Sequence, residues 1–309
     1  MRKRYAIRAL GLLIALTGVN IGCHQEPAVP KSAIPLTCQI YQIAAVEENV
    51  HDTTTFTYDA FGSLTESHFR RWWLDTLNTR LRQTYSYNAD HYLTIRVDQQ
   101  DRLGRSTERR SYDYSYQDGL IRQVVVKDYQ SGQITGYLDY EYDNGKLKTY
   151  KESNSQKTVL RQYTFDTSGK LTDYQDPDQL TSAQVTNGKI VSKLFKNGAR
   201  VASTFDSQGQ LISETTLAGT AETKTTYTYD NEPYWDKTQL RLRGIPIVDM
   251  GGHMNVHNLT SVAVQQTVGG RVTQARTLTY RNAYNQARYL FGYARSDGAQ
   301  QRTIYANCL

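Results

Sequence analysis

One short corner motif recurs six times along the chain, and it restricts the fold to antiparallel β-strands. Each copy has an aromatic residue, then Asp or Asn, two further residues, usually Gly, one residue and usually Leu. Asp at the first turn position accepts a hydrogen bond from the backbone N–H two residues on, and Gly with a positive φ forms the bulge that leads into the next strand. Each copy therefore predicts a hairpin corner, with a positive φ at Gly62, Gly169 and Gly209. The copies begin at these aromatic residues: Tyr58, Tyr87, Tyr142, Phe165, Phe205 and Tyr229.

The spacing of the aromatic residues that precede the corners indicates how the hairpins follow one another. Tyr58, Tyr87 and Tyr116 are 29 residues apart, and later intervals vary between 23 and 40 residues. Two strands and two turns need about this length, whereas a solenoid would keep a fixed period. We therefore predict an all-β fold, a long antiparallel meander of β-hairpins curled into a large barrel or barrel-like sheet.

The aromatic composition bears on the solvent around this sheet. The chain has 24 Tyr and 7 Phe, and its mean hydropathy is −0.63. A transmembrane barrel needs an aliphatic band toward lipid and carries Tyr mainly at the two interfaces, but here Tyr112, Tyr114 and Tyr116 share one face of a single strand. We expect a water-soluble sheet in which polar neighbours satisfy the buried Tyr hydroxyls.

The N-terminal residues predict a targeting segment. Residues 1–22 combine four basic side chains with an apolar run too short to span a bilayer, and they end at a small residue before Cys23. This pattern is typical of a bacterial lipoprotein signal, so we predict lipidation of Cys23; an ordinary cleaved signal or a structural thiol are the alternatives. Residues 23–36 contain three prolines and predict an extended tether. Residues 37–309 predict a single β domain.

The formal net charge of the chain bears on whether it binds nucleic acid. Removal of residues 1–22, with four basic and no acidic side chains, lowers the formal net charge from +6 to +2. The remaining chain has no Lys/Arg cluster that would follow a phosphate backbone. We therefore expect no nucleic-acid partner, and no motif indicates a cofactor.

The corner units resemble the YD repeats of Rhs-type proteins, which build β-strand shells. The order of motifs is similar to that of a family of Gram-negative envelope lipoproteins described as having a porin-like fold. The similarity lies in the segment 227–233 with its Tyr-x-Tyr-Asp and Pro233, the irregular stretch 244–257, Asn258 before a strand, and closing hairpins over 278–305. The resemblance implies a fold and an outer-membrane lipoprotein, facing either the periplasm or the outside, and it assigns no activity.

Three sets of residues are candidates for a functional site. Asp249, His253 and His257 are of the types that bind a divalent metal, although the nearby glycines favour a surface loop with solvated His. The aspartates of the corners would suggest glycoside hydrolysis if they were paired, but turn formation already explains them. A third set of aromatic residues could stack on sugars or simply pack in the core: Trp72, Trp73, Tyr234 and Trp235.

Two functions from different classes follow. The first is a non-enzymatic cell-envelope lipoprotein, held at the membrane by its lipid and acting as a β-scaffold that binds a glycan, a peptide or a partner protein. The second is a lipid-anchored hydrolase acting on polysaccharide. An enzyme requires convergent titratable groups in one pocket, and the sequence shows no such set, so it favours the first.

Cys38 and Cys308 lie near the two ends of the predicted domain. If an even number of strands curls shut, the start of the first strand lies beside the end of the last. We therefore predict a Cys38–Cys308 disulfide, which an envelope compartment permits; two unpaired thiols are the alternative.

Overall fold

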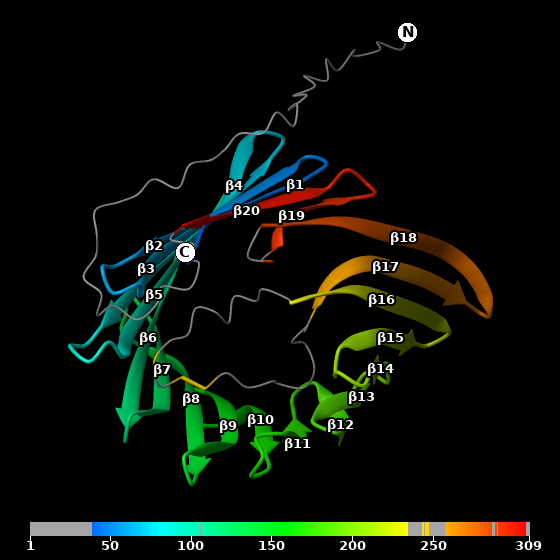
Figure 1. The fold of residues 1–309 in the computed structure, drawn as a ribbon. Helices are drawn as coiled ribbons and strands as arrows, with labels where there is room; N and C mark the ends of the chain where they lie inside the picture. The colour runs from blue at the N-terminus through cyan, green and yellow to red at the C-terminus, as the bar shows by residue number, and fades with distance from the viewer. Residues whose placement is uncertain are drawn as a thin grey trace. The chain divides into compact units, whose positions relative to one another are not determined.

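The computed structural model describes residues 39–105, 107–233, 243, 245–246, 257–285, 288 and 290–306. These residues form 20 strands, and none of the described segments is a helix (Figure 1). The strands are β1 (Gln39–Glu47), β2 (Val50–Tyr58), β3 (Leu64–Trp73), β4 (Thr76–Tyr87), β5 (Leu93–Arg102), β6 (Glu108–Gln117), β7 (Leu120–Asp128), β8 (Ile134–Asp143), β9 (Lys146–Asn154), β10 (Val159–Phe165), β11 (Leu171–Gln175), β12 (Leu180–Thr186), β13 (Lys189–Phe195), β14 (Arg200–Phe205), β15 (Leu211–Ala218), β16 (Ala221–Pro233), β17 (His257–Val268), β18 (Arg271–Tyr284), β19 (Leu290–Arg295) and β20 (Gln300–Ala306).

Consecutive strands pair antiparallel, and the last strand returns to the first. β1 pairs with β20 from Gln39 opposite Ala306 to Val46 opposite Gln300. β18 pairs with two strands: its residues 271–279 pair with β17, and its residues 280–284 pair with β19. Among the described strands one consecutive pair, β11 and β12, has no register of paired residues. The predicted meander is therefore confirmed, and it forms a nearly closed barrel-shaped sheet (Figure 1).

The corners have the predicted geometry. The carboxylate of Asp59 accepts backbone N–H groups from Phe61 at 2.9 Å and from Ser63 at 2.8 Å. Asn88, Asp166 and Asp206 accept the equivalent pairs of N–H groups, two and four residues on. The corner carboxylates thus satisfy the turn backbone. The three glycines predicted to have a positive φ do so: Gly62 at 82°, Gly169 at 86° and Gly209 at 82°.

The tyrosine before a corner connects its hairpin to the preceding one. The hydroxyl of Tyr87 donates to the carbonyl of Leu64 at 2.7 Å, and that of Tyr116 donates to the carbonyl of Leu93 at 2.8 Å. Each acceptor is the closing Leu of the preceding corner, so the sequence repeat is also a repeat of hydrogen bonds. Tyr229 makes the same bond to Leu211 at 2.6 Å. These bonds meet the expectation that buried Tyr hydroxyls find partners.

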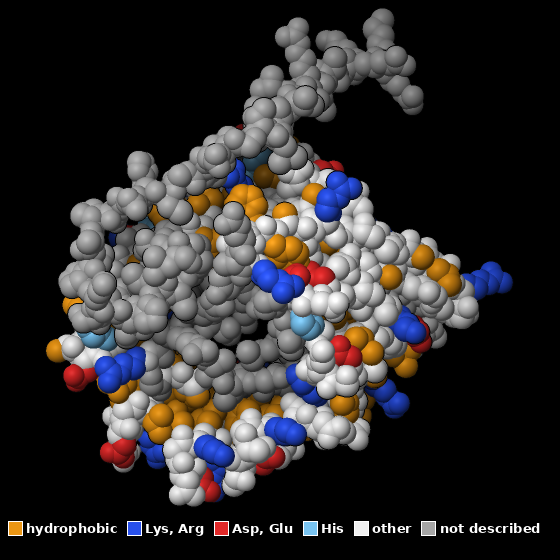
Figure 2. Space-filling view, viewed as in Figure 1, with side chains coloured by type: hydrophobic (Ala, Val, Ile, Leu, Met, Phe, Trp, Pro, Cys, Tyr) orange, Lys and Arg blue, Asp and Glu red, His pale blue; other side chains and the backbone are white. Residues whose placement is uncertain are grey.

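The two faces of the sheet differ in chemistry. The tyrosines of β6 share one face, as do Tyr140 and Tyr142 of β8, while residues between them, such as Asp113 and Glu141, point to the other face. Glu141 there pairs with Lys151 at 2.9 Å, and Asp113 pairs with Lys127. Figure 2 shows hydrophobic side chains gathered along β8–β11 on the side toward the middle of the ring. We call this inner side the tyrosine face. No helix among the described residues is long and apolar enough to cross a membrane.

The β1–β20 ladder allows a direct test of the predicted disulfide. Cys38 and Cys308 lie outside the described residues, but Gln39 next to Cys38 is paired with Ala306, two residues before Cys308. We expect the two cysteines to be bonded and, on the chain-entropy model, to stabilise the fold by about 5 kcal/mol before strain. Peptide mapping without reductant should recover one fragment that joins both cysteines. Recovery of both as alkylated free thiols from unreduced protein would show that the barrel closes through backbone pairing alone.

Candidate functional site: a cavity at the unpaired seam

The missing ladder between β11 and β12 creates a seam in the barrel, and a cavity of about 440 Å³ lies there. β11 pairs only with β10, and β12 pairs only with β13, within the described residues. The strands are joined by residues 176–179, where the N–H of Leu180 donates to the carbonyl of Asp176 at 2.8 Å. The cavity is lined by both strands and by the turn: Asp173, Tyr174, Gln175, Asp176, Pro177, Leu180, Thr181, Ser182 and Ala183.

A row of four tyrosines leads across the tyrosine face to the seam. The ring centroids of Tyr140 and Tyr150 are 5.0 Å apart, those of Tyr150 and Tyr163 are 5.7 Å apart, and those of Tyr163 and Tyr174 are 4.8 Å apart. The row crosses from β8 to β11 and belongs to the largest buried cluster. Ile245, from the connection between β16 and β17, packs against the same cluster. The row ends at Tyr174, so the seam wall is held by aromatic packing.

A chain of polar contacts connects the cavity to the neighbouring strands. The hydroxyl of Tyr174 and the Nε of Arg161 each donate to Asp176 Oδ2 at 3.3 Å. Arg161 also donates from Nη1 to Glu152 at 3.2 Å, and Glu152 accepts the hydroxyl of Tyr150 at 3.1 Å. Asp176 is only 7% exposed. One guanidinium therefore bridges two carboxylates through charge-assisted hydrogen bonds.

The titration of this network follows from burial and charge. Burial raises the pKa of Tyr174 and Tyr150, and the neighbouring tyrosines and carboxylates add to the increase. Burial by itself would lower the pKa of Arg161, but Glu152 and Asp176 outweigh it and raise the pKa. The tyrosines thus stay neutral and the arginine stays charged at physiological pH. These tyrosines and this arginine therefore serve as hydrogen-bond donors in the wall of the cavity.

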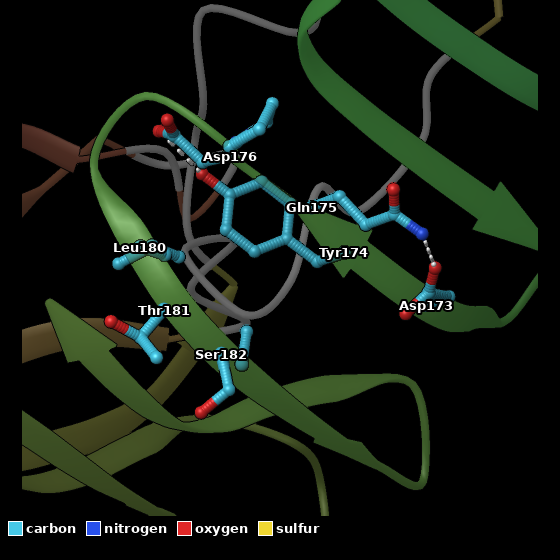
Figure 3. Close-up of a pocket in the computed structure, with 9 residues that line it drawn as sticks. Asp173, Tyr174, Gln175, Asp176, Leu180, Thr181 and Ser182 are labelled. Carbon is cyan, nitrogen blue, oxygen red and sulfur yellow. Dashed lines mark hydrogen bonds between the residues drawn. The ribbon is translucent and has the colours of Figure 1, made fainter. Parts of the chain in front are cut away.

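The seam has an apolar side and a polar side. Tyr174, Leu180 and Ala183 belong to the tyrosine face, where they pack in or against the buried cluster. Residues on the other side carry amide, hydroxyl and carboxylate groups, with Gln175 donating to Asp173 at 2.7 Å. Figure 3 shows the ring of Tyr174 directed at Asp176, with Leu180, Thr181 and Ser182 on the strand across the seam. A ligand here would meet an aromatic ring on one side and hydrogen-bonding groups on the other.

The local sequence explains why the ladder stops at this point. Asp176 directs its carboxylate to Arg161 and Tyr174, and the same residue accepts the N–H of Gln179 on Oδ1 at 3.1 Å. Pro177 follows and has no N–H to donate. These contacts hold the turn from the tyrosine face, and β11 before it has only five residues. The turn is thus fixed by side chains, while β11 keeps its ladder with β10.

Of the three predicted metal ligands, the structure describes His257. Asp249 and His253 lie outside the described residues. His257 begins β17, where its Nδ1 lies 3.0 Å from the carbonyl oxygen of Glu232 and its Nε2 lies 2.9 Å from Gln208 Oε1. In the described ranges no group of three or more His, Cys, Asp or Glu side chains could hold a metal ion. Both ring nitrogens of His257 thus contact protein atoms, and the three-residue metal site stays a prediction.

Next to His257, a cluster of polar side chains joins the end of β16 to the start of β17. Asp230 accepts the N–H of Asn258 at 3.1 Å and the side-chain amide of Asn282 at 3.0 Å, and it also accepts the hydroxyl of Tyr284. Asn258 is 2% exposed. Asp230, three residues before Pro233, and Asn258, the second residue of β17, therefore meet in the folded chain. We call the cluster of Asp230, Asn258, Asn282 and Tyr284 the clasp.

The remaining sequence candidates do not converge on the seam. Trp72 and Trp73 lie at the β3–β4 hairpin, where Trp73 is 53% exposed and Trp72 is partly buried. Tyr234 and Trp235 lie outside the described residues, as does Cys23. Sugar stacking by these residues stays a prediction.

Sequence reasoning missed the residues of the seam. The available signal was the segment 171–178, in which a five-residue strand is followed by Asp176-Pro177-Asp178. Pro within a run of strands marks an edge or an interruption. No pattern in the sequence joins Arg161 and Glu152 to this turn, because they lie on other strands.

Comparisons with known proteins give similarity of structure only. No family model matches the chain, and no curated protein matches it. Among solved structures, a porin-like protein from Bacteroides uniformis is 13% identical, with 86% of this chain and 96% of that chain covered and a TM-score of 0.38. A porin-like protein from Bacteroides vulgatus is 10% identical, with coverage of 87% and 98% and a TM-score of 0.33. Both TM-scores are below 0.5, so the fold assignment rests on this chain's own strand pairing.

The clasp predicts a pH-dependent stability. Burial by itself would raise the pKa of Asp230, but hydrogen bonds from Tyr284 and Asn282 outweigh it and hold the pKa below its ordinary value. The ionised form is thus favoured by folding, and its stabilisation is present above the unfolded pKa of about 3.9 and lost as the pH falls through the lower folded pKa. Asp230→Asn should reduce the free energy of unfolding by about 1–3 kcal/mol at neutral pH.

Urea denaturation at pH about 7 and about 3 checks this expectation, with the difference between wild type and Asp230→Asn shrinking in acid. Asp143→Asn, on an exposed hairpin corner, is the matched control and should change little. An undiminished difference in acid would show that the clasp acts through shape and not through charge.

Proposed function

We propose that this chain is a non-enzymatic lipoprotein of the cell envelope, a β-scaffold that holds a ligand in the seam cavity. The observation that carries the proposal is the cavity itself, because it lies where the barrel ladder is interrupted. Its volume of about 440 Å³ falls in the range of about 300–1,000 Å³ in which small-molecule sites occur. A tyrosine ring, a Leu side chain and several hydrogen-bonding groups converge on it.

The structure gives the hydrolase alternative no specific support. Glycoside hydrolysis needs one carboxylic acid that is protonated near neutral pH and a second that acts as nucleophile or base. At the seam, Arg161 lies between Glu152 and Asp176 and contacts both at 3.2 and 3.3 Å. Both carboxylates thus hold the same guanidinium in charge-assisted hydrogen bonds. The pair is thus suited to fixing the wall of a binding site.

The proposed address is the outer membrane, with the barrel in water and a lipid on Cys23 as its anchor. The face opposite the tyrosine face supports a barrel surrounded by water, because it carries ion pairs such as Glu141–Lys151. A barrel in lipid would carry an aliphatic band on that face. Metabolic labelling with a fatty-acid analogue should modify the wild-type chain and leave Cys23→Ser unlabelled. Label that persists in Cys23→Ser would refute the anchor.

The binding role is tested by filling the cavity. Ser182 is exposed on β12 and lines the cavity, so Ser182→Trp should obstruct the site without disturbing buried residues. Thr204→Trp, at an exposed position on β14, is the matched control. Two fluorescein-labelled probes are used in anisotropy titrations, chitotetraose and the peptide Lys-Val-Thr-Val-Thr-Val-Lys. We expect at least one probe to bind, with affinity reduced about tenfold or more by Ser182→Trp only. If neither probe shows binding that depends on position 182, the scaffold proposal is wrong.

A further inference from the structure

Three successive hairpins carry a large apolar side chain in the turn itself. Leu74 lies between β3 and β4, Leu103 between β5 and β6, and Tyr129 between β7 and β8. Their backbone N–H groups donate to carbonyls of the preceding hairpin at 3.0, 2.8 and 3.1 Å, so the three turns form a row at one end of the barrel. The side chains are 63%, 66% and 50% exposed. With Trp73, which is next to Leu74, we call them the apolar rim.

The backbone at Leu74 shows that a turn was not the only requirement at this position. Leu74 and Asp75 have φ of 46° and 63°, and a two-residue hairpin turn with positive φ at both positions favours Asn-Gly or Asp-Gly. The barrel uses such pairs at its opposite end, for example Asn144-Gly145 and Asn187-Gly188. A Leu in this backbone conformation is strained, and strain of this kind points to a role for the side chain.

The same end of the barrel exposes apolar groups on a further hairpin. Turns that follow odd-numbered strands lie at one end of an antiparallel meander, so the β17–β18 turn lies at the end of the apolar rim. Val268 and Val272 flank that turn and are both exposed. These tips are separated from one another around the barrel, and a flat surface can reach several of them at once.

We propose that this end of the barrel rests on a phospholipid bilayer, with the apolar rim inserted at the level of the headgroups. Trp and Tyr favour the membrane–water interface, where a ring and a polar group are both accommodated, and Trp73 and Tyr129 supply these residue types. The exposed Arg102 and Arg105 flank Leu103 and can contact lipid phosphates. The barrel wall stays in water, because only turns enter the interface.

The chain before β1 is long enough to permit this contact together with a lipid on Cys23. β1 begins at the end of the barrel opposite the apolar rim. Residues 24–38 number 15 and can span about 50 Å when fully extended, whereas the ten residues of β3 span about 34 Å. The lipid and the apolar rim can therefore reach the same bilayer.

Vesicle binding tests the contact. Residues 23–309 produced without the signal carry no lipid, so their binding to vesicles of phosphatidylethanolamine and phosphatidylglycerol measures the barrel itself. Leu74→Asn and Leu103→Asn should each lower the partition coefficient about tenfold, because each removes one inserted apolar side chain. Phe61→Asn is the matched control: Phe61 is 73% exposed in the β2–β3 corner at the opposite end, and its replacement should leave binding unchanged.

Urea denaturation separates lost contact from lost folding. Leu74→Asn should unfold at the same or a higher urea concentration than wild type, because Asn suits the backbone of this turn. Binding that is equal in wild type, Leu74→Asn and Leu103→Asn would overturn the proposal. Binding that disappears in high salt and does not respond to either Leu substitution would be adsorption through charge and would also overturn it.

Trp fluorescence locates the inserted residues. A variant with Trp72→Phe and Trp235→Phe keeps Trp73 as its single Trp, and vesicles with brominated acyl chains should quench its emission. Absence of quenching in bound protein would show that another surface meets the lipid. A dimer that forms without vesicles and dissociates on Leu74→Asn would assign the apolar rim to a second copy of the chain and not to lipid. Either result leaves the seam cavity and the Cys23 anchor to their own tests.

Discussion

Backbone hydrogen bonding between strand edges is the constraint on which the rest of this structure depends. A long antiparallel meander leaves two open edges, and open edges carry unpaired N–H and C=O groups that favour association with other chains. Here the described meander has an even number of strands, 20, so the start of β1 and the end of β20 lie at the same end of the sheet. Their antiparallel ladder removes both edges at once. The closed ladder in turn defines an inner face, on which the tyrosines gather.

The interior is stabilised by packing and by directional hydrogen bonds together. A Tyr side chain contributes a large ring, but its hydroxyl must find a partner once it is buried. In the repeats that partner is the carbonyl of the closing Leu of the preceding corner, as in the bond from Tyr116 to Leu93. Two repeat tyrosines differ: Tyr58 donates to the carbonyl of Ile40, and the buried hydroxyl of Tyr142 has no hydrogen-bond partner among the described residues.

The barrel departs from regularity at two places, and each has a polar group at its centre. Asp230 in the clasp joins the ends of β16 and β17 across a long connection. Asp176 at the seam contacts Arg161 and Tyr174 in the turn between β11 and β12, two strands without a register of paired residues. Both carboxylates accept hydrogen bonds from several donors, which the buried Asp176 and the partly buried Asp230 need to offset their lost hydration. The clasp closes the sheet around an insertion, and the seam opens it where a cavity lies.

Local patterns in the sequence determined the strands, the corners and the order of the hairpins. The Asp-to-Gly spacing set the corner geometry because a turn is formed by neighbouring residues, and the alternation of Tyr with polar residues set the two faces for the same reason. The tertiary structure alone decided which strand edges pair and which do not. Arg161, Glu152 and Asp176 come from three different strands, so their contact depends on strand register, and no local pattern encodes it. The clasp is intermediate: Asp230 and Asn258 each stand out locally, but only the folded chain brings them together. The seam could not be inferred from the sequence, because it arises from a pairing that does not form.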